Sequence, residues 1–278
     1  MPKTMHILNG DSTLDQLTKA GIEGECIVWR EMLVEGPVLT EIEGPLFWEK
    51  RLDFFKNTLG INAADYQIKV IDEIQKIQHI KEHEIICWFE YDLFCQINLI
   101  GLCALLFKQY SSRTTYSLIC TGYVEGYKGL TPLGHIAPKD FPGLLAQQEP
   151  LGYADLQLAN TLWNCYVDRD YDAMIKMAEN SVFTYLPKAI IQLQKTIPGP
   201  YGLNEIDLKL LSLLDEGLVQ KQSIIRAMLI WQHTATVYGF GDVQYQRALE
   251  NLSDYYQVRN GQYQLNQKGK TIYDELTS

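Results

Sequence analysis

The segment His6-Ile7-Leu8-Asn9-Gly10-Asp11-Ser12-Thr13-Leu14 predicts the turn from a buried strand into a helix, and the rest of the chain is arranged around this turn. Its apolar start is typical of a buried strand, and Gly10 permits a tight turn. Asp11, Ser12 or Thr13 can accept hydrogen bonds from backbone N–H groups in the first turn of the helix. Ligands of open α/β sheets bind beyond the carboxyl ends of strands, where a helix N-terminus offers free N–H groups. The turn therefore predicts either a ligand site or a capped helix without one.

Strand-like and helix-like segments alternate through the first half of the chain. After the first strand, strands are predicted at 25–29, 84–89 and 116–120, and helices at 45–60, 63–80 and 93–109. This alternation predicts a parallel sheet with helices on both faces. We assign residues 1–130 to a Rossmann-like α/β domain.

The second half of the chain is mainly helical by its pattern. Pro and Gly are frequent over 131–150, which indicates an irregular connector, and helices are predicted at 155–180 and 183–196. We treat 131–196 as a connector and helical segment. Residues 197–278 contain predicted helices at 204–217, 222–233 and 242–254, followed by a hairpin with Asn260-Gly261 at its turn. Three helices and a hairpin predict a winged-helix-like unit, and the alternative is a helical cap closed by a hairpin.

Composition indicates a soluble globular protein. The chain has 278 residues, of which 46% are hydrophobic and 21% charged. Its longest apolar stretch, Ile97 to Phe107, contains Asn98 and is too short to span a bilayer, and its start lacks a signal-peptide pattern. We therefore expect a cytoplasmic protein that does not enter the membrane.

Neither the cysteines nor the histidines predict a structural zinc site. The six cysteines include no Cys-x-x-Cys pair, so we expect buried, reduced thiols. His79 and His83 are spaced for one helical face, but the charged residues around them indicate a solvated helix end. We assign no metal ligand from the sequence.

Polar residues follow the predicted strands. Arg30, Glu31 and Glu35 come after the second strand, and Glu90 and Asp92 after the third. Because the carboxyl ends of parallel strands meet at one edge of a sheet, we expect these side chains to converge with Asp11. The predicted ligand-binding residues are His6, Gly10, Asp11, Ser12, Arg30, Glu31, Glu35, Glu90, Asp92 and Gln96.

Three functions are compatible with such a site. In the first, the α/β domain binds a small phosphorylated molecule, such as a nucleotide, with Arg30 on the phosphate and Glu31 or Glu35 on ribose hydroxyls. In the second, converging carboxylates hold Mg²⁺ or Mn²⁺ in an enzyme that acts on phosphoesters. The acids for that role are Asp11, Glu31, Glu90 and Asp92, but no Asp-x-Asp pair occurs among them. In the third, the protein is a non-enzymatic adaptor whose C-terminal unit binds a protein partner.

Charge argues against specific DNA binding. The formal net charge of the chain is −10, and residues 197–278 contain seven Lys and Arg against nine Asp and Glu. The predicted recognition helix, 242–254, carries only Arg247 as a cation. The hairpin region, with Arg259, Lys268 and Lys270, is the one basic spot of the unit. This excess of acidic over basic residues favours a protein partner over nucleic acid.

Four motifs in the first half resemble a bacterial family called domain of unknown function 1835. They are His6–Ser12, Trp29–Glu31, Glu35–Pro37, and Trp88–Glu90 together with Asp92 and Gln96. The later helical segment and the terminal unit are also similar to the architecture of that family. The resemblance implies no established activity, but it implies that these motifs occur together and form one composite site.

Gly10-Asp11-Ser12 also resembles the nucleophile segment of the Gly-Asp-Ser lipases and esterases. That family needs a Gly-x-Asn-Asp block and a late Asp-x-x-His as well. Residues 202–205 read Gly-Leu-Asn-Glu, and His233 lacks the aspartate. Because Ser12 then has no histidine base to activate it, the sequence argues against serine hydrolysis.

Overall fold

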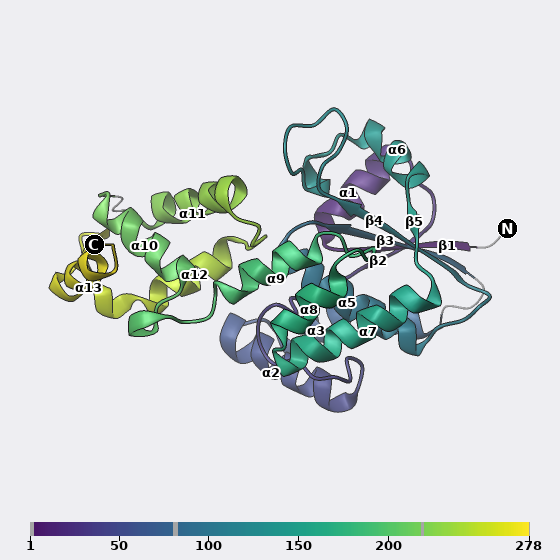
Figure 1. Cartoon of the computed structure of the whole chain (residues 1–278), viewed down its shortest axis with the longest axis horizontal. Helices are drawn as coiled ribbons and strands as arrows, with labels where there is room; N and C mark the ends of the chain where they lie inside the picture. The colour runs from purple at the N-terminus through teal and green to yellow at the C-terminus, as the bar shows by residue number, and fades with distance from the viewer. Residues whose placement is uncertain (1–2, 80–82, 218–219, 278) are drawn as a thin grey trace. The chain divides into compact units, whose positions relative to one another are not determined.

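The computed structural model describes residues 3–79, 83–217 and 220–277, and the chain divides into two compact units, Met1–Pro187 and Lys188–Ser278 (Figure 1). The first unit thus includes most of the segment 131–196 that the sequence sets apart as a connector. None of the helices within the described ranges combines the length and apolar character needed to span a membrane.

The first unit is built on a five-stranded sheet with the order β2-β1-β3-β4-β5. The strands are β1 (Lys3–Leu8), β2 (Glu25–Val28), β3 (His83–Glu90), β4 (Thr115–Thr121) and β5 (Glu149–Pro150). The first four are parallel, and the short β5 pairs antiparallel with β4. The predicted α/β class is therefore confirmed, and the arrangement is compatible with a Rossmann-like fold. Because β2 and β3 lie on opposite sides of β1, the order of the strands reverses between β1 and β3, where a ligand crevice is expected in such sheets.

Helices cover both faces of this sheet. On one face α1 (Asp11–Ala20) and α6 (Phe141–Ala146) pack on Leu8, Trp88 and Ile119 of the three central strands. The other face carries α5 (Leu93–Lys108), with α7 (Tyr153–Asp168) packed on it (Figure 1). Nearly every residue of α5 is buried because the helix lies between the sheet and α7, which explains its continuous apolar sequence.

The amphipathic helix predicted at 63–80 is broken in the structure. It follows α2 (Pro45–Leu59) as four short pieces: α3 (Ala63–Tyr66), the π-helical η1 (Gln67–Ile71), α4 (Asp72–Gln75) and η2 (Lys76–His79). Ile71, Ile74 and Ile77 are buried as expected, but Ile68 is 64% exposed. Steps of three residues fall short of one 3.6-residue turn, so Ile68 already lies well round the helix from Ile77, and the π-turn changes its direction further. Ile80, the predicted end, lies outside the described residues.

The connector and the helices after it also differ from the prediction. Residues 131–150 contain η3 (Leu133–His135), η4 (Pro138–Asp140), α6 and β5. The single helix predicted at 155–180 is wrong, because α7 ends where Arg169 adopts a left-handed φ of 60°. Asp170 then accepts a hydrogen bond from the N–H of Ala173 and begins α8 (Tyr171–Ala178). The helix α9 (Leu186–Gln194) contains the boundary between the two units.

The second unit consists of helices and one hairpin. Its elements are η5 (Pro200–Gly202), α10 (Glu205–Asp215), α11 (Lys221–Ala235), α12 (Asp242–Asn251), η6 (Ser253–Tyr255), β6 (Tyr256–Arg259), β7 (Gln262–Leu265) and α13 (Gln267–Thr277). The predicted hairpin is confirmed, and φ is positive at both Asn260 (51°) and Gly261 (76°), as in a type I′ turn. Gln220, just before α11, forms an antiparallel bridge with Gln262 of β7. The sequence analysis did not anticipate α13.

Candidate functional site

The turn from β1 into α1 leaves the start of the helix without a side-chain cap. Gly10 is the N-cap residue, with φ 104° and ψ 162°, a conformation essentially restricted to glycine. Asp11 is the first residue of the helix, and no side chain accepts a hydrogen bond as its N-cap. The predicted capping by Asp11, Ser12 or Thr13 is therefore wrong. The first-turn N–H groups of α1 are therefore left without a side-chain cap where β1 ends.

Asp11 and Arg30 come together at this edge, as the sequence predicts. Nε of Arg30 lies 3.0 Å from Oδ2 of Asp11, and Nη2 lies 2.6 Å from Oδ1. The third guanidinium nitrogen, Nη1, donates to the backbone oxygen of Lys69 at 3.1 Å. The pair is open to solvent, with side-chain exposures of 67% for Asp11 and 28% for Arg30. Hydrogen bonding to Arg30 lowers the pKa of Asp11, and the same contact raises the pKa of Arg30.

Ser12 and Glu90 face the same short segment, η3. Glu90 ends β3 and is only 9% exposed, and its Oε1 accepts a hydrogen bond from the N–H of Leu133 at 2.9 Å. A Cβ placed on Gly134 would lie 3.7 Å from Oγ of Ser12. Gln16 of α1 donates to the backbone oxygen of Gly134 at 3.1 Å. The start of α1 and the end of β3 are thus connected through this segment.

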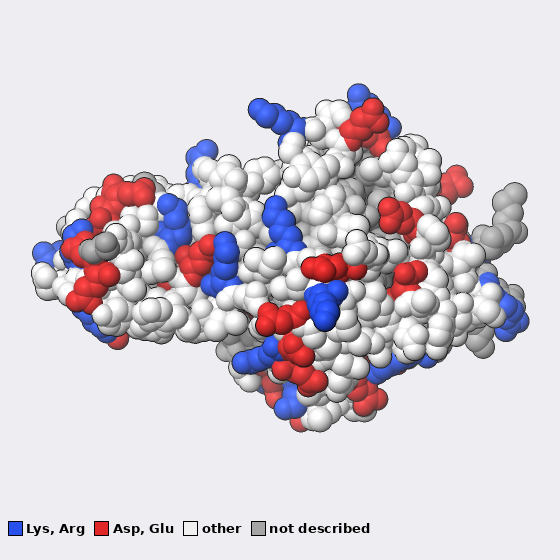
Figure 2. All heavy atoms as spheres, in the orientation of Figure 1, with Lys and Arg blue, Asp and Glu red and all other residues white. Residues whose placement is uncertain are grey.

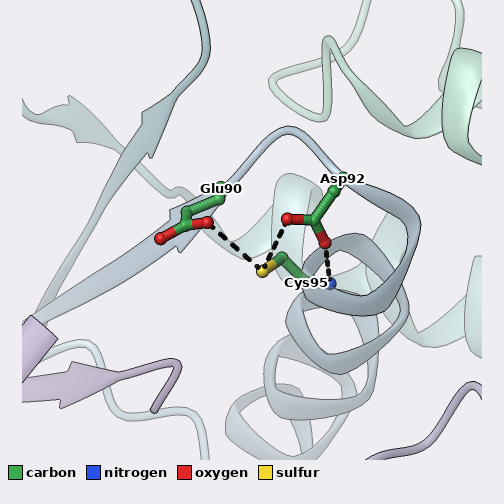
Figure 3. Close-up of side chains that lie close together, drawn as sticks. All are labelled: Glu90, Asp92 and Cys95. Atoms are coloured by element: carbon green, nitrogen blue, oxygen red, sulfur yellow. Dashed lines mark hydrogen bonds between the residues drawn. The ribbon is translucent and has the colours of Figure 1, made fainter. Parts of the chain in front are cut away.

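Glu90, Asp92 and Cys95 form a cluster at the start of α5 (Figure 3). Asp92 is the N-cap of α5, and its Oδ1 accepts a hydrogen bond from the N–H of Cys95 at 2.8 Å. Sγ of Cys95 lies 3.4 Å from Oδ2 of Asp92 and 4.0 Å from Oε2 of Glu90. One ligand atom from each of the three residues lies within 4.8 Å of the others.

The electrostatics of this cluster favour neutral side chains. Burial and the neighbouring Asp92 raise the pKa of Glu90, and burial raises the pKa of Asp92 despite its bond from the N–H of Cys95. Burial raises the pKa of the Cys95 thiol well above its usual value. Within the part of the chain that the structure describes, neither carboxyl group has an ion-pair partner, whereas Arg30 pairs with Asp11 and Arg51 with Glu31.

Gln96 and Thr121 add polar groups beside Glu90. Gln96 is fully buried, and its Nε2 donates to the backbone oxygen of Glu90 at 2.7 Å and to Sγ of Cys120 at 3.3 Å. Thr121 lies opposite Glu90 in the register of β3 and β4. Oε1 of Gln96 and Oγ1 of Thr121 are both buried without a hydrogen-bond partner among the described residues. Thr121 also lines a cavity of about 240 Å³ beside the outer edge of β4.

Glu31 belongs to a buried ion pair with Arg51, and Glu35 contacts the same arginine through its backbone. The carboxylate of Glu31 accepts hydrogen bonds from Arg51, from the N–H of Met32 and from the hydroxyl of Tyr66. Glu35 places its backbone oxygen 2.6 Å from Nη1 of Arg51. The carboxylate of Glu31 is therefore occupied, and we do not include Glu31 or Glu35 in the proposed site.

His6 lies inside the sheet and has a packing role. Nε1 of Trp88 donates to its Nδ1 at 3.1 Å, so Nε2 carries the proton and donates to the backbone oxygen of Glu23 at 3.2 Å. Burial lowers the pKa of His6, which keeps this tautomer neutral. A Cβ on Gly24 would come within 2.7 Å of the imidazole ring, so only glycine fits beside it.

Sequence reasoning missed Asn9, Cys95 and Asn98. Nδ2 of Asn9 donates to Sγ of Cys95 at 2.8 Å, and Nδ2 of Asn98 donates to Oδ1 of Asn9 at 2.9 Å. Asn98 also donates to the backbone oxygen of Glu31 at 2.7 Å, so α5 connects the residues that follow β1 and β2. A polar Asn98 inside an apolar helix was a usable signal, but Cys95 was not, because buried cysteine resembles any small apolar residue.

The structure therefore separates the predicted residues into groups. Gly10, Asp11, Ser12 and Arg30 lie at the open edge; Glu90, Asp92 and Gln96 lie just inside it; and His6, Glu31 and Glu35 support the fold. The side chains of His79 and His83 lie outside the described residues. No model of a known protein family matches the chain, and neither does any curated protein.

Proposed function

We propose that the protein binds a small phosphorylated molecule, such as a nucleotide, at the carboxyl edge of the sheet between α1 and Arg30. The observation that carries this proposal is the start of α1: Gly10 takes a glycine-only conformation, and no side chain caps the helix. Uncapped N–H groups and the positive end of the helix dipole form a ready anion site.

Arg30 supports the same proposal by its position and exposure. Its guanidinium is held at the sheet edge by the backbone oxygen of Lys69, and its present partner, Asp11, is well exposed. An exposed ion pair contributes little, so a phosphate can replace or join Asp11 on the guanidinium without a large loss. A guanidinium also offers the bidentate geometry that phosphate oxygens prefer.

A thermal-shift screen of nucleotides and sugar phosphates, with and without divalent metal, tests the proposal, because a ligand that binds only the folded state raises its stability. For a compound that binds, Arg30→Gln should weaken affinity by about one to two decades, since charge-assisted hydrogen bonds contribute about 1.5–3 kcal/mol. Lys19→Gln is the matched control, because Lys19 is a cation in an exposed ion pair at the far end of α1. Equal effects of the two changes, or no effect of either, would remove Arg30 from the site.

A second candidate function is a Mg²⁺- or Mn²⁺-dependent enzyme acting on phosphoesters. The short distance between the carboxyl groups of Glu90 and Asp92 favours this function. Asp11 and Glu31 do not support it, because each is paired with an arginine. Hydrolysis of a phosphoester that requires added metal, and that Glu90→Gln abolishes, would identify this activity.

We propose that residues 197–278 form a winged-helix unit that contacts protein rather than a specific DNA sequence. The bridge between Gln220 and Gln262 supports the winged-helix assignment, because it adds a short segment before α11 to the hairpin. Lys268 and Lys270, two of the three predicted basic residues of the hairpin region, form ion pairs with Asp254 and Asp215. On the face shown in Figure 2, basic and acidic side chains are interspersed over this unit.

An anisotropy titration of the full chain with duplex DNA, at low and at physiological salt, tests this assignment. Weak binding that does not depend on sequence and disappears with salt is the expected result. Sequence-selective binding in the nanomolar range would overturn it.

We also propose that the chain belongs to the bacterial family called domain of unknown function 1835. The motifs that carry the resemblance contact one another across the sheet, which supports the idea that they form one functional unit. Trp88 bonds to His6 and Arg30 to Asp11, and Arg51 links the carbonyl groups of Glu35 and Pro37 to the carboxylate of Glu31.

A further inference from the structure

We propose that Glu90, Asp92 and Cys95 bind a single transition-metal ion, with Zn²⁺ as the best fit, at the carboxyl end of β3 (Figure 3). The proposal does not depend on the phosphorylated ligand, because these three side chains lie inside the edge at which Arg30 and Asp11 meet. It concerns a thiol and two carboxyl groups, a ligand set that the sequence did not suggest.

The distances from the thiol to the two carboxyl groups suit one tetrahedral ion, and the carboxyl oxygens lie within 4.8 Å of each other. With Zn–S near 2.3 Å and Zn–O near 2.1 Å, sulfur and oxygen ligands of one ion lie about 3.6 Å apart. Sγ of Cys95 is 3.4 Å from Oδ2 of Asp92 and 4.0 Å from Oε2 of Glu90. Small side-chain adjustments would bring both distances to the tetrahedral value.

Each carboxyl group is already oriented by a backbone N–H group. Oε1 of Glu90 accepts from Leu133, which leaves Oε2 facing the thiol. Oδ1 of Asp92 accepts from Cys95, which leaves Oδ2 facing the same thiol. Such outer hydrogen bonds are what fixes the ligands of protein metal sites. In both residues one oxygen is held and the other is directed at a common point.

The surroundings supply further polar groups, and among the described residues no cation pairs with Glu90 or Asp92. Asn9 donates to Sγ of Cys95 at 2.8 Å, a bond that stabilises a thiolate. Gln96 is fully buried with its amide against the backbone of Glu90, and its Oε1 lacks a partner among the described residues. A buried amide oxygen without a partner is costly, and a metal ion or its bound water would satisfy it.

The chemistry of the donors selects the metal. Mg²⁺ and Ca²⁺ prefer oxygen ligands, whereas a thiolate with two carboxylates suits Zn²⁺ and its spectroscopic substitute Co²⁺. Binding replaces the protons of the thiol and the carboxyl groups with one divalent ion. Three protein ligands leave a fourth position for water or for an oxygen of a bound molecule, as in zinc sites that act on substrates.

Titration of the chelator-treated full chain with Co²⁺ tests the proposal. We expect one Co²⁺ to bind per chain and to give an intense near-ultraviolet thiolate-to-metal absorption band. Added Zn²⁺ should displace the Co²⁺ and remove this band. Cys95→Ser should abolish the band. Glu90→Gln and Asp92→Asn should weaken metal affinity by about tenfold or more, and asparagine at 92 keeps the cap of α5.

The control is Cys26→Ser, which removes a thiol of intermediate exposure on β2 and should leave both the band and the stoichiometry unchanged. Absence of a thiolate band in the wild-type chain, or its persistence in Cys95→Ser, would overturn the proposal. If the Cys95→Ser variant does not fold, the proposal is tested by the Co²⁺ spectrum of the wild-type chain and by the metal affinity of Asp92→Asn. Metal alone is the probe, so failure here is distinct from failure to bind a phosphorylated compound.

Discussion

Arg51 and Glu31 form an ion pair in which Nη2 lies 2.6 Å from Oε2, and neither side chain is exposed to solvent. The guanidinium also donates to the backbone oxygens of Met32, Glu35 and Pro37. Arg51 therefore holds the chain that leaves β2 against α2, and it donates to three carbonyl groups, of which that of Met32 also accepts from the N–H of Glu35.

Replacing Arg51 by methionine should lower the free energy of unfolding by about 3–5 kcal/mol, because Glu31 would stay buried without its cation. Urea denaturation measures the change. Lys50→Met is the control, since the neighbouring Lys50 is exposed and its loss should cost less than about 0.5 kcal/mol. A loss below about 1 kcal/mol for Arg51→Met would show that the pair is not structurally required.

Gly10→Ala should destabilise the protein by about 1–3 kcal/mol through backbone strain alone, because no atom lies within 4 Å of an added Cβ. The matched control is Gly143→Ala in α6, where space is also free and φ is not positive, so alanine should be neutral or stabilising. Thermal denaturation of both variants gives the comparison. If Gly10→Ala were as stable as Gly143→Ala, the positive φ assigned to Gly10 would be contradicted.

Asp11→Asn should strengthen the binding of a phosphorylated ligand. The change removes a carboxylate that occupies Arg30 and repels phosphate, and an exposed pair of this kind contributes about 0.2–1 kcal/mol. We therefore expect a gain of a few-fold in affinity by calorimetry. Asp15→Asn, one turn further along α1, serves as the control for the general effect of charge. Weaker binding by Asp11→Asn would instead identify Asp11 as a direct ligand contact.

His6 contributes stability that should be lost as the pH drops below the ordinary His pKa of 6.5. Burial lowers the pKa of His6 in the folded protein, although Glu84 and the carbonyl of Glu23 oppose this shift. The unfolded chain consequently binds a proton at His6 at a pH where the folded chain does not, so the His6 contribution to the free energy of unfolding decreases with decreasing pH. The raised pKa values of Glu90 and Asp92 act in the opposite direction.

His6→Asn should remove the contribution of His6, because an amide does not titrate, so the slope of stability against pH should be less positive in the variant than in the wild type. His135→Asn, at an exposed histidine, is the control for the loss of a histidine elsewhere in the chain. Denaturation at several pH values between 5 and 7.5 measures the slopes. Identical slopes for the His6→Asn variant and the wild type would contradict the assignment of a buried, neutral His6.

The parallel sheet could be predicted from the sequence because its strands are short apolar runs that alternate with helical periodicity. The same approach failed at 63–80, since a π-turn depends on local hydrogen bonding that the spacing of isoleucines does not report. It missed β5 as well, because two residues, Glu149 and Pro150, carry no strand pattern and pair only because β4 offers an edge.

Asp11, Arg30, Glu90 and Asp92 could be predicted to lie near the carboxyl edge of the sheet, because they lie at or just after the ends of the parallel strands β1, β2 and β3. Position at a strand end could not separate Glu31 from this set, because its partner Arg51 comes from α2, and a basic residue within a helical pattern does not reveal a distant carboxylate. Cys95 could not be predicted as a site residue, because its role depends on the positions of Glu90 and Asp92 and not on a sequence pattern around it.

The position of β1 in the sheet also constrains how the chain folds during synthesis. β1 is made first but lies between β2 and β3, and its pairing with β3 begins at Lys3 and His83. Until β3 has left the ribosome, one edge of an apolar strand has no partner, and closing the long intervening loop carries an entropic cost. The nascent chain is therefore most exposed to pairing with other chains before residue 90 emerges, and chaperone contact has its greatest value in that interval.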